Sequence, residues 1–357
     1  MRAATALLAG VLAACSSAPA GQVRTLAGGA DDGFADGAGR DARFGPPGDI
    51  VVDSNGVIYV ADTFNSAIRR VTPEGDVSTV AGGREGFADG VGTDTRFHLP
   101  SGLALDGDDT LYVADAFNAV IRRIDLSTSE VTTVAGRPDE RGYVDGPLDG
   151  ALFGAPFDVE VDATSGQLWV ADAENDAIRI VNLDTGRVST VAGGSNGIAD
   201  GVGSEAQFSG PDALALDRAG GVWVTERSSH TIRHVEADGT VTTVLGSPFR
   251  SGFADGLGSD ALLNRPHGMA STPTGQLVFA DQHNNVLRVL EEGEGTRLVA
   301  GRRYDSRALN PEDYPAPQDG PAGEAQLRDP RNVAVAADGT LYFADLFALR
   351  LLSGWSD

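Results

Sequence analysis

The sequence contains only one cysteine in 357 residues, Cys15, and it lies within the first twenty residues. The rest of the chain therefore cannot form an internal disulfide. Disulfides commonly stabilise secreted domains that are too small to build a sufficient core. We expect this chain to depend instead on hydrophobic packing and on closure of its sheets.

Basic residues are scarce as well: 27 Lys and Arg stand against 51 Asp and Glu, and the formal net charge is −24 at pH 7. Nucleic acids and anionic membrane surfaces bind basic faces, so this balance argues against both as partners. Much of the acid excess lies in repeated Ala-Asp and Asp-Gly pairs, where Asp is a common turn residue. We attribute it mainly to turns and solubility, with cation binding as an alternative.

Several catalytic motifs are missing from the sequence. It has no HExxH, no Cys/His cluster, no G-x-S-x-G and no P-loop. These absences remove the usual signatures of zinc hydrolases, serine hydrolases and nucleotide-binding proteins. They favour a binding role, and an enzyme that uses none of these motifs stays an alternative.

The start of the chain has the features of a targeting signal. Arg2 supplies a positive charge, and the apolar stretch 3–11 is too short to span a bilayer. Leu12-Ala13-Ala14-Cys15 resembles the lipoprotein box of bacteria, in which the cysteine becomes the lipidated first residue. The resemblance implies a signal peptide at 1–14 and a short linker at 15–22 that begins with lipidated Cys15.

This resemblance also implies a location. Ser16 and Ser17, with no Asp after the cysteine, favour the outer membrane of the bacterial cell envelope. The lipid would then be the only contact with the membrane. The alternative is an ordinary secretory signal, cleaved near Ala18 or Ala20.

One phrase recurs about six times along the remaining chain. It reads YVADTFNSAIRR at 59–70, YVADAFNAVIRR at 112–123 and WVADAENDAIRI at 169–180, and it returns in weaker form at 223–234, 278–289 and 342–352. The linking phenylalanines Phe44, Phe97, Phe153 and Phe208 are spaced 53, 56 and 55 residues apart. A period of this size is typical of a four-stranded propeller blade.

Each repeat divides into short strands separated by turn residues, which predicts an antiparallel meander. The third strand alternates apolar residues with Arg, so we expect it to be half-exposed near the rim. The last repeat lacks an outer strand, whereas VRTLAGG at 23–29 matches VSTVAGG at 77–83. The N-terminal segment is therefore expected to complete the last blade and to close an all-β, six-bladed propeller over 23–357.

The recurring pattern GP.GLALD..G.LYVAD..N..IR.V....G.V.TVAG resembles the NHL repeat, which builds six-bladed β-propellers. The resemblance covers about 23–357 and implies the fold. It does not imply one function, because NHL propellers include protein-binding and RNA-binding scaffolds, a peptide-amidating lyase, and relatives of lactonases and antibiotic lyases.

Residues present in nearly every blade are expected to be structural, because a single active site breaks the symmetry of a ring. The Asp that ends the second strand and the Asn three residues later suit turn or left-handed positions. The recurrent Arg on the third strand is available to pair with an acid. These repeated positions are Asp62, Asp115, Asp172, Asp281 and Asp345; Asn65, Asn118, Asn175 and Asn284; and Arg69, Arg122, Arg179, Arg233, Arg288 and Arg350.

Positions where the blades differ are the candidates for function. The starts of the inner strands should ring the mouth of the central channel, because each lies on the same face as the end of its antiparallel neighbour. Blades 4 and 5 also depart from the repeat in the loop after the second strand. The candidate ligand-binding residues are Asp49, Asp158, Asp212, Glu226, His267, His283, Arg331 and Asn332.

Two interpretations of the mouth stay open. Asp158, Asp212, His267 and Asn332 offer the oxygen and nitrogen ligands that Ca²⁺ or a borderline metal prefers, and lactonase-like propellers hold a divalent ion in this general place. The alternative is a hydrated polar channel without an ion. No feature of the sequence requires a cofactor.

The link at 301–327 is longer than its counterparts and is either a binding loop or a tolerated insertion.

Together these features predict a monomeric cell-envelope module that binds a protein, glycan or small molecule at the channel mouth. The alternative function is a metal-dependent, lactonase- or lyase-like enzyme with its site at the same mouth.

Overall fold

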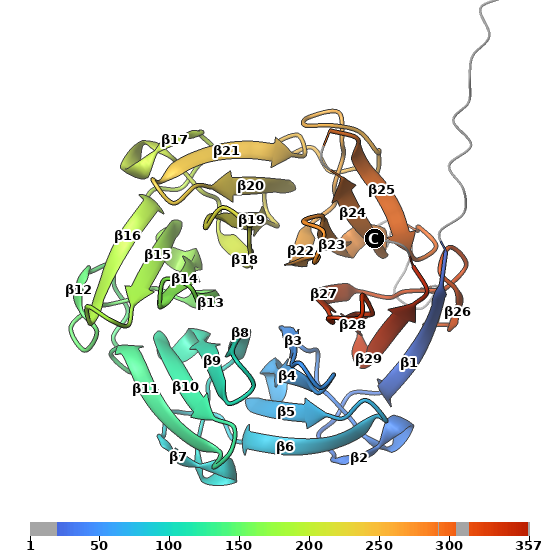
Figure 1. Cartoon of the computed structure of the whole chain (residues 1–357), viewed down its shortest axis with the longest axis horizontal. Helices are drawn as coiled ribbons and strands as arrows, with labels where there is room; N and C mark the ends of the chain where they lie inside the picture. Colours follow the sequence, from blue (N-terminus) through green and yellow to red (C-terminus); the bar gives the residue numbers. More distant parts are fainter. Residues whose placement is uncertain (1–19, 292, 305–313, 356–357) are drawn as a thin grey trace, which may run out of the picture.

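The chain forms a closed ring of six antiparallel sheets, which are the blades of a β-propeller (Figure 1). The structure is a computed structural model, and it describes residues 20–291, 293–304 and 314–355. Each blade places its first strand at the central channel, and the following strands lie progressively further out. This arrangement confirms the predicted fold class.

The blades follow the sequence repeat, with four main strands in each. Blade 1 contains β3 (Ile50–Val52), β4 (Ile58–Asp62), β5 (Ala67–Val71) and β6 (Asp76–Gly82). Blade 2 contains β8 (Pro100–Asp106), β9 (Thr110–Asp115), β10 (Val120–Asp125) and β11 (Glu130–Gly136). Blade 3 contains β13 (Pro156–Asp162), β14 (Gln167–Asp172), β15 (Ala177–Asn182) and β16 (Arg187–Gly193).

The second half of the ring repeats this order. Blade 4 contains β18 (Pro211–Leu216), β19 (Val222–Glu226), β20 (Thr231–Val235) and β21 (Thr240–Leu245). Blade 5 contains β22 (Pro266–Ser271), β23 (Leu277–Asp281), β24 (Val286–Glu291) and β25 (Gly295–Ala300). Blade 6 contains β27 (Pro330–Val335), β28 (Leu341–Asp345), β29 (Phe347–Ser353) and β1 (Gln22–Gly29).

Five blades carry a fifth, two-residue strand that the sequence did not predict. It comes from the link that precedes the blade and pairs with the outermost main strand, so it covers part of that strand's free edge. These short strands are β2 (Gly37–Ala38), β7 (Gly90–Val91), β12 (Gly146–Pro147), β17 (Gly201–Val202) and β26 (Gly320–Pro321).

The N-terminal strand closes the ring, as predicted. β1 pairs antiparallel with β29 from Gln22 opposite Ser353 to Gly29 opposite Phe347. On its outer side it pairs with β26. Val23 and Leu352 are both buried in the same hydrophobic cluster. The two ends of the ring are therefore joined by backbone hydrogen bonds and by packing.

Hydrophobic packing fills the seams between blades. Phe97, which lies in the link between blades 1 and 2, is fully buried together with Tyr59 of blade 1 and Val113 of blade 2. Phe44, Phe153 and Phe208 are buried in the same way at other seams. The regular spacing of these phenylalanines thus places one buried aromatic ring in each of these four seams.

The recurrent arginine of the third strand is fully buried, so the expectation of a half-exposed position near the rim was wrong for this residue. In blade 1, Arg69 Nη1 donates to Asp62 Oδ2 at 2.7 Å, and Nη2 donates to Asp36 Oδ1 at 2.7 Å. The guanidinium also lies 4.7 Å from the ring of Phe34. Two carboxylates and an aromatic ring therefore make this buried cation tolerable.

The same ion-pair ladder occurs in all six blades. The inner acid ends the second strand, and the outer acid comes from the link before the blade. The six sets are Asp62–Arg69–Asp36, Asp115–Arg122–Asp89, Asp172–Arg179–Asp145, Glu226–Arg233–Asp200, Asp281–Arg288–Asp255 and Asp345–Arg350–Asp319.

The turn after the second strand carries side chains to the channel mouth. In blade 1 residues Thr63–Asn65 form a 3₁₀ turn, and Ser66 takes the left-handed conformation with φ of 52°. Asn65 is not the left-handed residue; its Nδ2 instead donates to Asp62 Oδ1 and to the carbonyl oxygen of Gly33, both at 2.8 Å. These bonds fix the turn, and Thr63 and Phe64 line the mouth.

Candidate functional site

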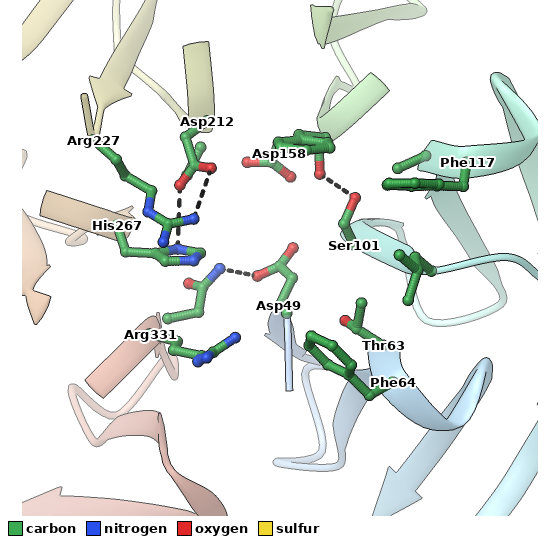
Figure 2. A pocket seen from close by; sticks show the side chains of 16 residues that line it. Asp49, Thr63, Phe64, Ser101, Phe117, Asp158, Asp212, Arg227, His267 and Arg331 are labelled. Atoms are coloured by element: carbon green, nitrogen blue, oxygen red, sulfur yellow. Dashed lines mark hydrogen bonds and ion pairs between the residues drawn. The ribbon is translucent and has the colours of Figure 1, made fainter. Parts of the chain in front are cut away.

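A cavity of about 200 Å³ lies where the inner strands begin, at one mouth of the central channel (Figure 2). Six of the eight predicted ligand-binding residues line it: Asp49, Asp158, Asp212, His267, Arg331 and Asn332. The other lining residues are Gly48, Thr63, Phe64, Leu99, Ser101, Ala116, Phe117, Phe157, Ala213 and Arg227.

Two glycines on inner strands leave space for polar side chains of the neighbouring blades. A Cβ atom on Gly102 would lie 2.3 Å from Asp158 Oδ1, and a Cβ atom on Gly268 would lie 2.3 Å from Asn332 Cγ. Contacts this short do not occur between real atoms, so any larger residue would displace the polar side chain. The glycines of blades 2 and 5 thus make room for the polar side chains of blades 3 and 6.

Asp49 and Asp158 are held by backbone amides of two blades. Asp49 accepts hydrogen bonds from Ile50 N at 2.6 Å and from Leu103 N at 2.7 Å, and the side-chain amide of Asn332 also donates to it. Asp158 accepts from Val159 N at 2.8 Å and from Leu214 N at 2.6 Å. These carboxylates therefore join blade 1 to blade 2 and blade 3 to blade 4.

Burial changes the ionisation of both carboxyl groups. Removal from water raises the pKa of Asp49 to about 7, against the opposing effect of its hydrogen bonds. Burial, followed by the nearby charges of Asp49 and Glu160, raises the pKa of Asp158 well above its ordinary value. At neutral pH the two groups together carry less than two negative charges.

The opposite side of the mouth holds cations around Asp212. Arg227 Nη1 lies 3.5 Å from Asp212 Oδ1, and His267 Nδ1 lies 3.4 Å from Asp212 Oδ2. Burial raises the pKa of Asp212, while Arg227, Arg265 and Arg331 oppose the rise. Burial and the same three arginines lower the pKa of His267 well below its ordinary value, so the imidazole is neutral at pH 7.

The polar side chains on this side of the mouth are largely buried. The side chain of Asp212 is 8% exposed and that of His267 is 14% exposed. Neither Asp212 Oδ2 nor His267 Nδ1 has a hydrogen-bond partner among the described residues. A polar ligand that supplied such a partner would recover part of the cost of burying these atoms.

The remaining wall of the cavity is aromatic. Phe64 and Phe117 lie opposite Arg227, His267 and Arg331 across the mouth (Figure 2). The ring of Phe117 is fixed from two sides, with the Arg141 guanidinium 4.9 Å and the His98 ring 5.2 Å from its centroid. One half of the mouth is therefore cationic and polar, and the other half is apolar.

The structure does not bring Glu226 and His283 to the cavity. Glu226 is fully buried inside blade 4, where its Oε2 lies 2.9 Å from Arg233 Nη1 and replaces the usual Asp of the ladder. The backbone of His283 donates to the carbonyl oxygen of Asn264, and its side chain is not among the lining residues. For Glu226 the departure from the repeat thus has a structural role within blade 4.

No family model matches the chain. The chain is 30% identical over 335 residues to NHL repeat-containing protein 2 from Homo sapiens, an alignment that covers 84% of this chain and 45% of that protein. Because the blades make up nearly all of the chain, an alignment with this coverage includes most of them. The chain is an NHL-repeat β-propeller protein. It spans less than half the length of this curated relative.

Solved structures show the same fold for the NHL propeller. A protein of unknown function from Bacteroides thetaiotaomicron matches with a TM-score of 0.71 and 20% identity, over 93% of this chain and 76% of that one. An auxiliary nutrient binding protein from the same species matches with a TM-score of 0.66 and 14% identity, over 94% of this chain and 76% of that one. At these identities the likeness shows the fold alone.

The mouth of the NHL propeller does not fit a metal ion in this arrangement. Both Asp158 oxygens and Asn332 Oδ1 already accept hydrogen bonds from backbone amides, and Arg227 lies beside Asp212. Across the described ranges, no three His, Cys, Asp or Glu side chains are arranged to hold a metal. Bonded acceptors and neighbouring guanidinium groups disfavour a cation.

Three residues that line the site of the NHL propeller were not among the candidates chosen from the sequence. Phe64 and Phe117 occupy the same position of the repeat in blades 1 and 2. Arg227 stands where the equivalent residues of blades 1 to 3 are Thr63, Ala116 and Ala173. This replacement of a small residue by Arg marks a departure of blade 4 from the repeat, and it is the signal that identifies Arg227 as a candidate.

Part of the sequence interpretation concerns residues outside the described structure. Cys15 and the proposed signal peptide lie there, as do residues 305–313 of the long link. Within the part that is described, no helix of the NHL propeller is long and apolar enough to cross a membrane.

Proposed function

We propose that this NHL propeller is a binding module of the bacterial cell envelope whose ligand site is the cavity at the channel mouth. The single observation that carries the proposal is the composition of this cavity. It combines two guanidinium groups, a neutral imidazole and three phenylalanines in one concave space of about 200 Å³. Concave sites with a few convergent polar groups in an apolar surround are typical of small-molecule binding.

The asymmetry of the cavity supports a functional role. Arg227, His267 and Arg331 come from blades 4, 5 and 6, and none of them belongs to the ion-pair ladder that stabilises each blade. The repeated Asp and Arg residues are committed to that ladder, whereas six of the eight candidates chosen where the blades differ line one cavity. A rigid scaffold with a single variable face is how propellers generally carry a specific site.

Envelope location is proposed from the sequence at the start of the chain. Lipidation of Cys15 would place a monomeric propeller on the outer membrane with no transmembrane helix. A similar fold in an auxiliary nutrient binding protein is compatible with this role. The ligand would then be a small molecule that reaches the cell surface or the periplasm.

The proposal is tested by a ligand screen in which the cavity is varied. Purified protein is screened by ligand-observed NMR against anionic, cationic, neutral and sugar-like small molecules, and each hit is measured again with Phe117→Ala and Arg331→Gln. We expect at least one class of hit to lose affinity in both variants. Arg187→Gln, which changes an exposed residue of blade 3, is the matched control and should bind as the unchanged protein does.

A result in which every hit keeps its affinity in both variants would contradict a site at the mouth. Thermal unfolding of each variant shows whether lost binding reflects a lost fold. Because neither Phe117 nor Arg331 belongs to the ladder, both variants should unfold within about 1 kcal/mol of the unchanged protein.

One observation favours a second candidate function, a lactonase- or lyase-like enzyme. His267 is mostly buried and its Nδ1 lies 3.4 Å from Asp212 Oδ2, so the carboxylate could orient the imidazole as a general base. Turnover of lactones that disappears in His267→Gln would establish it. Binding without turnover would leave the protein a binding module.

A further inference from the structure

We infer that the cavity at the mouth takes a small amphipathic anion, a carboxylate joined to an aromatic or branched apolar group. This inference rests on the proposed function and specifies its ligand. It follows from the division of the mouth into a cationic side and an aromatic side, which face each other across one cavity (Figure 2).

The cationic side concentrates positive charge in a strongly acidic protein. Arg227 and Arg331 line the cavity, and Arg265 is close enough to act on the ionisation of Asp212 and His267. Asp212 and Asp329 pair with Arg227 and Arg331. The guanidinium groups are thus gathered on one side of the cavity, in a chain whose formal net charge is −24.

The two arginines also have donors that the protein does not use. Arg331 donates through Nε to Asp329 Oδ2 at 2.9 Å, and among the described residues its terminal nitrogens make no hydrogen bond. Arg227 reaches Asp212 only at 3.5 Å, and its buried Nε has no partner within the described ranges. Planar guanidinium donors of this kind match the two oxygens of a carboxylate.

The acids at the mouth do not cancel this preference. Both oxygens of Asp49 and both oxygens of Asp158 accept hydrogen bonds from backbone amides, so these groups are part of the wall. Burial also disfavours their charged forms. Asp212 is held between Arg227 and His267.

The aromatic side accounts for the apolar part of the ligand. Phe64 is 62% exposed and Phe117 is 38% exposed, which is unusual for residues that could pack in a seam. Phe117 is held in place by Arg141 and His98, so its ring is ordered before any ligand binds. An apolar group that covered these rings would remove them from water, and a ring could stack on them.

The volume of the cavity limits the size of this ligand. At about 200 Å³ the cavity is smaller than the roughly 300–1,000 Å³ typical of pockets for drug-sized molecules, so it favours a small ligand. A single ring or a branched chain with one carboxylate fits this space. A long acyl chain or an oligosaccharide does not fit entirely within it.

The test compares four probes that differ by one property each. Phenylacetate carries both the ring and the charge, phenethylamine carries the ring with the opposite charge, benzyl alcohol carries a neutral ring, and acetate carries the charge alone. Isothermal titration should show phenylacetate binding at least about tenfold more tightly than any of the other three. Its affinity should fall as the NaCl concentration is raised, because part of the attraction is electrostatic.

Variants of the two sides separate the two contributions. Arg331→Gln should weaken phenylacetate at least about tenfold and leave benzyl alcohol unchanged. Phe117→Ala should weaken phenylacetate and benzyl alcohol alike. Arg187→Gln and Phe249→Ala change an exposed arginine and an exposed phenylalanine that do not line the cavity, and should leave all four affinities as they are.

The possible outcomes distinguish this inference from the function on which it rests. Preferential binding of phenethylamine or benzyl alcohol that depends on Phe117 would overturn the anionic ligand and keep a binding site at the mouth. Failure of all four probes, together with a sugar-like hit from the screen that depends on Arg331, would do the same. Phenylacetate that binds equally well to Arg331→Gln and Phe117→Ala would place the site elsewhere and overturn both.

Discussion

Replacing Glu160 with Gln is expected to stabilise the propeller at neutral and alkaline pH. Glu160 lies on inner strand β13 and faces the central channel beneath the mouth, where it shares a cavity with Asp49 and Asp158. Burial, and then the charge of Asp49, raises the pKa of Glu160 from 4.5 to about 8. No hydrogen bond to its side chain offsets this cost in the described part of the chain.

The sign of the effect follows from proton binding. The pKa of Glu160 is higher in the folded protein, so the folded state holds the proton more tightly than the unfolded state does. Its contribution to stability is complete below about pH 4.5 and is lost as the pH rises toward 8. A pH of 7 is 2.5 pH units above 4.5, the pKa of this carboxyl group in the unfolded chain. Since one pH unit corresponds to about 1.4 kcal/mol, the loss of stability at pH 7 is about 3 kcal/mol at most. Water in the channel reduces this to roughly 1–3 kcal/mol.

Thermal unfolding at about pH 4.5, 7 and 9 measures the effect. Glu160→Gln should raise the melting temperature by a few degrees at the two higher values and have little effect at the lowest. Glu74→Gln is the control, because Glu74 is an exposed turn residue. An equal gain at all three pH values, or a loss of stability at pH 9, would refute the reasoning.

Three further outcomes are expected. Asp172→Ala removes an ion-pair partner of fully buried Arg179 and should lower the free energy of unfolding, measured by chemical denaturation, by about 3–5 kcal/mol. The control Asp184→Ala changes an exposed residue and should lower it by less than about 0.5 kcal/mol. Deletion of 22–29 should expose the edge of β29 and cause aggregation in size-exclusion chromatography; an unchanged elution profile and melting curve would contradict closure by this strand. Cys15→Ser should move the protein from the membrane fraction to a soluble one or block its maturation, and a variant that stays in the membrane fraction would show that Cys15 is not the anchor.

The fold could be predicted because its information is repeated. Six copies of one phrase give the number of blades, and the match between 23–29 and 77–83 gives the strand that closes the ring. Each copy supports the others, so a weak match such as 342–352 is still interpretable. The two-residue outer strands were missed because two residues carry no periodicity.

The buried arginines could not be predicted from the pattern of the third strand. Alternation of apolar and charged residues normally indicates one exposed face. Here Arg69 finds its second acid 33 residues earlier in the chain, at Asp36, and only the packing of the link brings that acid to the strand. Burial of the charge is a consequence of this tertiary contact.

The candidate site was predicted in part, and the division has a physical reason. Asp49, Asp158 and Asp212 occupy equivalent or adjacent positions of inner strands, and strand register alone brings such positions to the mouth. Phe117 and Arg227 lie in turns, where the direction of a side chain depends on the local backbone. Their approach to the cavity therefore became visible only in three dimensions.

A crystal structure of the protein with its tightest small-molecule ligand tests the central claim most directly. We predict that the ligand lies in the mouth cavity, with an anionic group toward Arg227 and Arg331 and an apolar group against Phe64 and Phe117. A ligand bound instead in the seam between blades 4 and 5, beside Trp223, would contradict the claim that function resides where the blades differ at the channel mouth.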